Sequence, residues 1–348
     1  MCVVAAGLSD VGLQREHNED SFVVLKEHDL FVVADGMGGH RAGDIASRIA
    51  TETISEFFRT TANEDVTWPF HFDMNLSEEE NRLLTGIRVA NRQIFERSTR
   101  SRECHGMGTT VVGAMFSPKK QRMYIGHVGD SRCYRVRGGQ IRLLTRDHSL
   151  INDYLVAMPD LTDEQKSELP KNVITRALGM QDHVVVDLQH DDPKQEDVYV
   201  LCSDGLSGMV SDDEITQIVT GADDVREACR RLIERANERG GEDNITAVLI
   251  KIEESADRLV SDDGNGSVGG GEGGLAGRRG TNGARAARHG NADPPLTGVA
   301  PAAKPRARYG QSDLCGPGWV LRIRHGYAVV RGDRGAHGDR ERVHSPAE

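Results

Sequence analysis

Five aspartates stand where stretches that favour β-strands begin or end, a placement that could gather carboxylates around metal ions. Asp35 follows the apolar run 31–34, and Asp204 follows the largely apolar run 198–203. Three further aspartates occupy similar positions: Asp20, Asp130 and Asp243. Glycine follows both Asp35 and Asp204, and a glycine lets the backbone approach a ligand closely. The Asp35 carboxylate and the Gly36 carbonyl therefore form a compact set of hard oxygen donors.

Each of these aspartates also has an ordinary structural interpretation, because Asp-Gly is a common turn dipeptide. A single site would favour that interpretation. Five carboxylates at one edge of a sheet would instead repel one another strongly unless cations lay between them. Oxygen-rich clusters of this kind prefer Mg²⁺ or Mn²⁺ to softer metals. Together the five aspartates favour a metal site, but periodicity alone does not show that they converge.

The segments that must position these aspartates are short strands separated by two helical blocks. Runs rich in valine, isoleucine and aromatic residues predict strands at 31–34, 110–116, 123–128, 133–136, 198–202 and 246–250. Apolar residues spaced three and four apart predict helices at about 42–60, 78–98, 211–220 and 223–239. Strands that follow one another without intervening helices favour antiparallel sheets covered by helices, and a Rossmann pattern is absent.

The last 90 residues differ in kind from the rest. Residues 259–348 hold 19 of the 39 glycines and carry a net charge of +4, which leaves −15 for residues 1–258. This glycine-rich composition cannot bury enough apolar surface to offset the entropy of ordering. We therefore expect a disordered tail, in which 318–323 has the weak alternation of a short strand.

The longest apolar runs are far shorter than the roughly 20 residues that cross a bilayer, and the start lacks the features of a secretory signal. We expect a cytoplasmic protein without a membrane span. The acidic balance of residues 1–258 argues against nucleic acid as a partner. The six cysteines contain no C-x-x-C pair, which favours neither a zinc knuckle nor a disulfide framework.

Eight motifs follow one another between about residues 5 and 252. They are Ser9-Asp10-x-Gly12-x-x-Arg15-x-x-Asn18-Glu19-Asp20, Asp35-Gly36-Met37-Gly38-Gly39-His40, Gly108-Thr109-Thr110, His127-Val128-Gly129-Asp130-Ser131-Arg132, Asp147-His148-Ser149, Ile174-Thr175-Arg176-x-Leu178-Gly179, Ser203-Asp204-Gly205-Leu206 and Asp243-Asn244-x-Thr246. In this order they resemble the motif series of the metal-dependent PP2C (PPM) serine/threonine protein phosphatases. The chain looks most like the bacterial branch, which opposes Hanks-type kinases.

The resemblance implies an α+β fold, with a central β-sandwich of two antiparallel sheets and helices on both outer faces. In that family two Mg²⁺ or Mn²⁺ ions share a bridging water in a cleft at the edge of the sandwich. The positions that match the ligands are Asp20, Asp35, the Gly36 carbonyl, Asp204 and Asp243. Asp130 matches the residue that holds a weaker third ion with Asp204, and a turn aspartate is its structural alternative.

Two further residues match functional positions of the family. Arg15 matches the phosphate-binding arginine, whose planar guanidinium can donate two parallel hydrogen bonds, and a surface arginine is the alternative. His40 matches a proposed general acid. His127 and His148 are interpreted as structural histidines that satisfy local hydrogen bonds. Cys202 lacks the C-x5-R loop of cysteine phosphatases, so a phosphocysteine mechanism is disfavoured.

The resemblance implies a catalytic domain at 1–256, with a substrate-contacting flap at 148–179. Composition separates from it a Gly/Arg/Ala/Pro-rich tail at 257–348. The predicted function is Mg²⁺- or Mn²⁺-dependent hydrolysis of phosphoserine and phosphothreonine in proteins, opposing bacterial Ser/Thr kinases. Its predicted partners are phosphorylated proteins, kinases among them. The alternative is a non-catalytic relative that binds phosphoproteins or kinases. A two-metal nuclease is disfavoured because it would need a basic groove.

Overall fold

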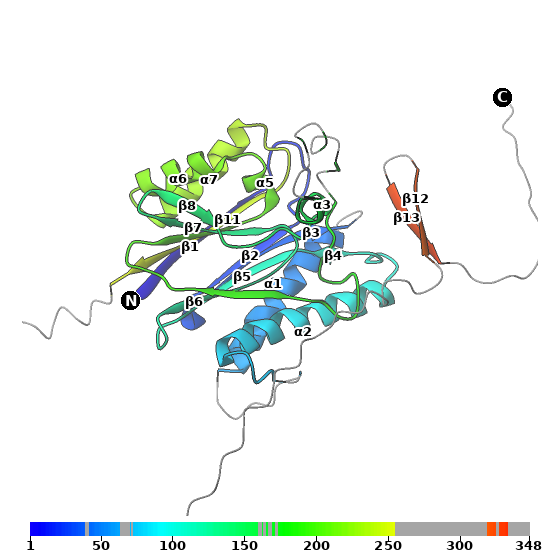
Figure 1. Ribbon diagram of the computed structural model, residues 1–348, viewed down its shortest axis with the longest axis horizontal. Coiled ribbons are helices and arrows are strands. Elements are labelled where there is room, and N and C mark those ends of the chain that lie inside the picture. Colours follow the sequence, from blue (N-terminus) through cyan, green and yellow to red (C-terminus); the bar gives the residue numbers. More distant parts are fainter. Residues whose placement is uncertain are drawn as a thin grey trace, which may run out of the picture. The chain divides into compact units, whose positions relative to one another are not determined.

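The computed structural model (Figure 1) describes residues 1–38, 42–62, 70, 72–158, 162, 165, 169–170 and 173–254, and the backbone of 319–324 and 327–332. The chain separates into two units, Met1–Gly269 and Gly270–Glu348. In the first unit two antiparallel sheets stack on each other, with helices on both outer faces (Figure 1). The α+β sandwich expected from the sequence is therefore confirmed.

The first sheet has five strands in the order β1-β11-β10-β7-β8. Their bounds are β1 Cys2–Asp10, β7 Arg132–Arg137, β8 Gln140–Leu143, β10 Val198–Cys202 and β11 Ile245–Glu253. β11 pairs with β1 over its whole length, with Cys2 opposite Glu253 and Asp10 opposite Ile245. The start of the chain thus lies beside the last strand of the sandwich.

The second sheet has six strands, in the order β2-β3-β5-β6-β9 with β4 paired to β3. Their bounds are β2 Asp20–Leu25, β3 Leu30–Met37, β4 Gly108–Thr109, β5 Val111–Ser117, β6 Arg122–Val128 and β9 Asp187–Asp191. A short 3₁₀ helix, η1 (Lys26–His28), connects β2 with β3.

β3 is buried on both of its faces, which explains its uninterrupted apolar sequence. Phe31 and Val33 belong to the cluster between the sheets, whereas Val32 and Ala34 belong to the cluster beneath the helices. Successive residues of a strand point to opposite faces, so one short run fills both clusters. The apolar run ends at Asp35, while the strand itself continues to Met37.

Helices α1 (Ala42–Thr60) and α2 (Glu78–Arg100) cover the second sheet, and α6 (Asp212–Gly221) and α7 (Val225–Glu238) cover the first. These bounds agree with the predicted ranges to within two residues. α2 begins with a capping box, in which Ser77 Oγ accepts from Glu80 N–H and Ser77 N–H donates to Glu80 Oε2. A single turn, α5 (Asp204–Ser207), follows β10, and α3 (Leu150–Ala157) begins after the N-cap Ser149.

The strands that the predicted ranges leave out include β1 and β9. β9 has the sequence Asp-Leu-Gln-His-Asp, which lacks the apolar pattern of a strand, yet it forms an edge strand that pairs with β6. In the second unit, β12 (Trp319–Arg324) pairs with β13 (Tyr327–Gly332), so the alternation at 318–323 does correspond to a strand. The rest of the predicted tail lies outside the described residues. No helix in the described part of the chain is long and apolar enough to cross a membrane.

Candidate metal centre

Two of the aspartates come from neighbouring strands of the second sheet. β2 and β3 pair in a register that places Asp20 opposite Asp35. Thr110 holds Asp35 from the other side, since its Oγ1 accepts from Asp35 N–H at 3.1 Å and its N–H donates to the Asp35 carbonyl at 2.8 Å. Ordinary antiparallel pairing therefore sets the positions of the first two carboxylates.

Asp204 and Asp243 come from adjacent strands of the first sheet. Asp204 begins α5 just after β10, and Asp243 lies just before β11. Gly205 is required between them, because a Cβ at this residue would lie 2.1 Å from the Asn244 carbonyl oxygen. The two loops therefore touch, and they bring both aspartates to the same edge of the sheet.

Asp20 connects the two sheets through its side chain. Its Oδ2 accepts hydrogen bonds from Ser203 Oγ and from Thr246 Oγ1, both at 2.7 Å. Ser203 directly precedes Asp204, and Thr246 lies in β11, so both donors belong to the opposite sheet. The carboxylates from the two sheets therefore meet in one place.

The five aspartates act on one another electrostatically. Burial, and then the charges of Asp20, Asp204, Asp130 and Asp243, raise the pKa of Asp35 well above its ordinary value. Burial is also the main reason why the pKa of Asp20 and that of Asp130 rise to about 7, and why that of Asp204 is raised. The structure thus brings together all five predicted aspartates. They cannot all be ionised at neutral pH without positive charge beside them.

Three of the carboxylates have a buried oxygen without a hydrogen-bond partner among the described residues. These atoms are Asp20 Oδ1, Asp130 Oδ1 and Asp204 Oδ1. A buried acceptor without a partner is costly to a folded protein. Carboxylate oxygens are also the ligands that Mg²⁺ and Mn²⁺ prefer. The residues present therefore fit divalent ions, which would satisfy these oxygens and offset the repulsion at once.

Gly36 follows Asp35 at a point where only glycine fits. A Cβ on this residue would lie 2.1 Å from the Gly43 carbonyl oxygen. Its N–H donates to the Glu19 carbonyl at 3.1 Å, which ties the segment before β2 to β3. The Gly36 backbone is therefore packed tightly beside the carboxylates.

Arg15 lies at the mouth of the site. Its Nη2 contacts Asp243 Oδ2 at 2.7 Å, yet 51% of its side chain remains exposed. With Asp130, Asp204 and Asp243 it lines a cavity of about 610 Å³. Such a guanidinium can reach both the carboxylates and an anion that enters from solvent. His40, the predicted general acid, lies outside the described residues.

A family model described as Protein phosphatase 2C matches residues 14–250 of the sequence. The chain belongs to the protein phosphatase 2C family. The predictions of this family and of its enzyme class, the metal-dependent protein-serine/threonine phosphatases, are confirmed.

Bacterial relatives match a similar share of the chain. Serine/threonine phosphatase stp of Listeria welshimeri is 36% identical over 252 residues, which cover 70% of this chain and 93% of the relative. Protein phosphatase PhpP of Streptococcus pneumoniae is 34% identical over 255 residues, covering 71% and 96%.

Solved structures show the same architecture. The Mycobacterium tuberculosis serine/threonine phosphatase PstP/Ppp matches with a TM-score of 0.62 and 32% identity, covering 73% of this chain and 100% of that one. The catalytic domain of serine/threonine phosphatase PstP in complex with two manganese ions matches with a TM-score of 0.61 and 32% identity, covering 72% and 99%.

This protein phosphatase 2C chain supports its carboxylates through residues to which we assigned no role from sequence. Asn244 Oδ1 accepts from Glu19 N–H at 2.7 Å, and its Nδ2 donates to the carbonyls of Val11 and His17 at 2.9 Å. Asn244 and Thr246 both belong to the motif Asp243-Asn244-x-Thr246. The signal was therefore present in the sequence, but only the structure shows which group each side chain contacts.

A second arginine, Arg132, also lines the cavity, but it is bonded within the protein. Arg132 donates to Asp147 through Nε at 3.0 Å and Nη2 at 2.7 Å, and to Tyr134 OH through Nη1 at 2.9 Å. Because each of its three nitrogens donates within the protein, Arg132 stabilises the wall of the cavity. Arg15 differs because its contact is with one of the clustered aspartates at the open side.

Proposed function

We propose that this protein phosphatase 2C hydrolyses phosphoserine and phosphothreonine in proteins, with two bound divalent ions, Mg²⁺ or Mn²⁺. One observation carries the proposal: carboxylates from both sheets converge with buried, unpaired oxygens in a cavity that an exposed arginine also lines. An acidic cluster alone would repel a phosphate. The same cluster loaded with divalent cations would attract one.

The proposed ligands of the two ions are Asp20, Asp35, the Gly36 carbonyl, Asp204 and Asp243, and those of a weaker third ion are Asp130 and Asp204. Bound divalent ions supply an activated water and neutralise charge on the phosphoryl oxygens. The chain's own part is to hold the carboxylates in fixed positions. Ser203 and Thr246 do this for Asp20, and Thr110 does it for Asp35.

Arg15 is the proposed phosphate-binding residue. Its guanidinium can donate two parallel hydrogen bonds to phosphoryl oxygens, and its contact with Asp243 places it beside the proposed ions. The role of His40 in protonating the leaving alkoxide stays a prediction. Cys202 is unsuited to act as a nucleophile, since it is fully buried and burial raises the pKa of its thiol to about 12.

A non-catalytic phosphoprotein- or kinase-binding relative of the same fold is the alternative. Such a protein would have no need of every metal carboxylate, because its fold does not depend on activity. Here the carboxylates of Asp20, Asp35, Asp204 and Asp243 are all present and lie together, which favours catalysis.

We place this activity opposite bacterial serine/threonine kinases, with phosphorylated proteins as substrates and the kinases among the partners. Similarity to bacterial serine/threonine phosphatases over most of their length supports this setting. We also propose that residues 1–256 are the catalytic domain, with 148–179 as its flap and 257–348 as a separate tail. A cytoplasmic location and the exclusion of nucleic acid stay predictions from the sequence.

Phosphate release from a phosphothreonine peptide tests the proposal. The protein should be active with Mn²⁺ or Mg²⁺, inactive in EDTA, and active again when metal is restored. Asp35→Asn and Asp204→Asn should each abolish activity while the fold is kept. Asp213→Asn, at an exposed position of α6, is the matched control and should retain the wild-type rate. Full activity of Asp35→Asn would rule out the assignment, and peptide binding without hydrolysis by the wild type would favour the alternative.

A further inference from the structure

His148 holds the loop that carries Asp130 at two points. The His148 N–H donates to the Gly129 carbonyl at 2.9 Å, and the Gly129 N–H donates to His148 Nδ1 at 3.0 Å. Both polar backbone groups of Gly129 are thus bonded to one residue. His148 is only 5% exposed, so water does not compete for these bonds.

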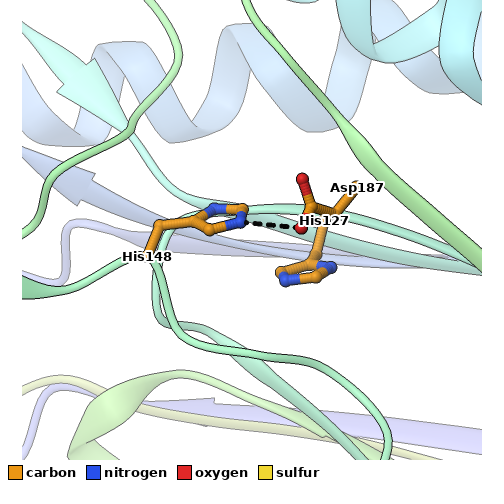
Figure 2. Close-up of side chains that lie close together, drawn as sticks. All are labelled: His127, His148 and Asp187. Atoms are coloured by element: carbon orange, nitrogen blue, oxygen red, sulfur yellow. Dashed lines mark ion pairs between the residues drawn. The ribbon is translucent and has the colours of Figure 1, made fainter. Parts of the chain in front are cut away.

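The contact with Gly129 also defines how the imidazole is protonated. Because Nδ1 accepts a hydrogen bond, the proton of the neutral ring lies on Nε2. Nε2 faces Asp187 Oδ2 at 3.3 Å (Figure 2), and Arg176 Nη1 donates to Asp187 Oδ1 at 2.6 Å. Burial lowers the pKa of His148. Burial raises the pKa of Asp187, but hydrogen bonds from Arg176 and His148 outweigh it and hold that pKa below its ordinary value.

His127, His148 and Asp187 lie close enough together to suggest a metal site (Figure 2), but their geometry argues against one. The two imidazoles are stacked, with ring centroids 4.8 Å apart and planes 8° apart. The nitrogen lone pairs lie in the ring planes, so two stacked rings do not aim at one ion. Arg176 Nη1 lies 3.0 Å from His148 Nε2, so a cationic group already occupies this position.

The position of the Asp130 carboxylate depends on the conformation of Gly129, the residue that precedes it. Asp130 Oδ1 has no hydrogen-bond partner among the described residues. Gly129 has a φ of +106°, and a Cβ there would lie 2.6 Å from Thr110 Cβ, so this conformation is restricted to glycine. A glycine loop has many other conformations open to it unless hydrogen bonds select one. His148 supplies two such bonds.

We infer that His148 is a positioning residue for Asp130, because its ring nitrogen bonds the Gly129 N–H and so fixes the backbone that leads into this carboxylate. The inference rests on the proposed role of Asp130 in holding a weaker third ion with Asp204. Loss of a partner that orients a ligand typically weakens metal binding about 10- to 100-fold. Removal of the Nδ1 acceptor should therefore weaken the weakest ion site and leave the two tighter sites unchanged.

Two amide substitutions separate the two ends of the ring. In His148→Asn, Oδ1 can replace Nδ1 as the acceptor for Gly129, but no group reaches Asp187. In His148→Gln, Nε2 can still donate to Asp187, but no acceptor remains at the δ position. Both variants lose the stacking with His127, so a general packing defect should affect them alike.

Mn²⁺ binding by the full chain is the first measurement. Titration calorimetry should show the weakest site within about threefold of wild type in His148→Asn, and weakened about 10- to 100-fold in His148→Gln. Equal weakening of this site in both variants would overturn the inference, because the loss would then come from packing.

Exchange of the Gly129 amide, followed by NMR on the metal-free full chain, is the second measurement. It should stay slow in His148→Asn and accelerate at least about tenfold in His148→Gln. Labelling with carbonyl-¹³C valine and ¹⁵N glycine restricts the spectrum to the Val–Gly amides of Gly12, Gly113, Gly129 and Gly269. Gly12 and Gly113 then serve as internal standards. Equal exchange of the Gly129 amide in the two variants would overturn the inference.

Asp130→Asn is the reference that separates failure of this inference from failure of the proposed function. If Asp130→Asn removes the weakest site but His148→Gln leaves it intact, the positioning role of His148 is wrong and the third-ion role of Asp130 stands. If Asp130→Asn leaves the weakest site intact, the third-ion role is wrong and the consequence drawn for metal binding falls with it.

Discussion

Half-buried aspartates occur in two regions of the sandwich, and their surroundings differ. Asp191 in β9 accepts from Arg135 Nη1 at 2.7 and 2.9 Å and from Tyr199 OH at 2.6 Å. Asp20 in β2 is also partly exposed, but its hydrogen-bond donors are the hydroxyl groups of Ser203 and Thr246. One carboxylate is matched by a guanidinium from the other sheet, and the other is not.

The pKa values show what this difference means. Burial raises the pKa of Asp191, but hydrogen bonds from Tyr199 and Arg135 outweigh it and keep that pKa below its ordinary value. Burial raises the pKa of Asp20 to about 7, and the charges of Asp204 and Asp243 add to the rise. The fold therefore places a positive charge beside the carboxylate of Asp191, which supports the structure. Among the described residues it places none of its own beside the Asp20 carboxylate, which is proposed to bind an ion.

Removal of the matched carboxylate should have the largest effect on stability. Asp191→Ala leaves Arg135, whose side chain is 13% exposed, as a largely buried cation, and deprives Tyr199 OH of its acceptor. We expect the free energy of unfolding to fall by about 3 kcal/mol in chemical denaturation. Asp192→Ala is the control, because Asp192 is 76% exposed and its pair with Arg122 should contribute less than about 1 kcal/mol. Equal effects of the two substitutions would contradict the comparison.

Arg15 is a cation that contacts one of the clustered aspartates, but unlike Arg135 it remains exposed to solvent. Arg15→Ala removes a charge-assisted interaction with phosphate that is worth about 1.5 to 3 kcal/mol, so kcat/KM should fall roughly 10- to 100-fold. Arg15→Lys should restore only part of this, because an ammonium lacks the planar fork. Steady-state kinetics on a phosphothreonine peptide measure both variants. A wild-type kcat/KM for Arg15→Ala would mean that Arg15 is an ordinary surface residue.

Asp35→Asn should have the opposite effect on stability to Asp191→Ala. In EDTA the substitution removes one of several mutually repelling charges, so the free energy of unfolding should rise by about 1 to 2 kcal/mol. In saturating Mn²⁺ the wild type should instead be more stable than Asp35→Asn, because it gains stability from metal binding. Thermal unfolding with and without metal measures this, with Asp213→Asn as the control. A less stable Asp35→Asn in EDTA would show that the carboxylates do not repel as described.

The stability of the metal-free protein should also depend on pH, because the clustered carboxylates are protonated at low pH. In the folded state the pKa values of Asp20 and Asp130 are about 7, above the ordinary value of 3.8, so the folded protein retains protons that the unfolded chain releases. Their contribution to stability is complete below about pH 4 and is lost as the pH rises through about 7. We expect the free energy of unfolding in EDTA, measured by urea unfolding, to fall by at least about 2 kcal/mol between pH 5 and pH 8. Bound Mn²⁺ should remove this loss, because it requires ionised ligands.

Removal of the chain after Glu254 should have the smallest effect. Neither group of aspartates lies beyond this residue, and β11, which ends at Glu253, keeps its full pairing with β1. Hydrolysis of a small aryl phosphate should stay within about twofold of the full chain. Insolubility or inactivity of the shortened chain would instead place part of the predicted tail within the catalytic domain.

The sequence revealed the carboxylates of the metal centre because each stands where an apolar run meets a turn, as Asp35 and Asp204 do beside their glycines. It could not reveal that Asp20 lies opposite Asp35, since that depends on the register of β2 against β3. The hydroxyl donors to Asp20 come from the other sheet, and no local pattern predicts contacts between sheets.

The Arg135–Asp191 pair could not be predicted from the sequence, for a related reason. Its members are 56 positions apart and lie in different sheets, in β7 and β9. The polar sequence of β9 reads as a loop, because periodicity identifies a strand only where one face is apolar. The aspartates proposed to bind metal were therefore easier to predict than the aspartate that is matched internally.

The pairing of β1 with β11 has a consequence for how the protein is made. β1 is synthesised before the other strands of the catalytic unit, but its partner β11 is synthesised after all the others. The uncharged segment Cys2–Ser9 therefore stays unpaired while most of that unit is made. Contacts between such distant segments form slowly, and unpaired strands expose nascent chains to aggregation.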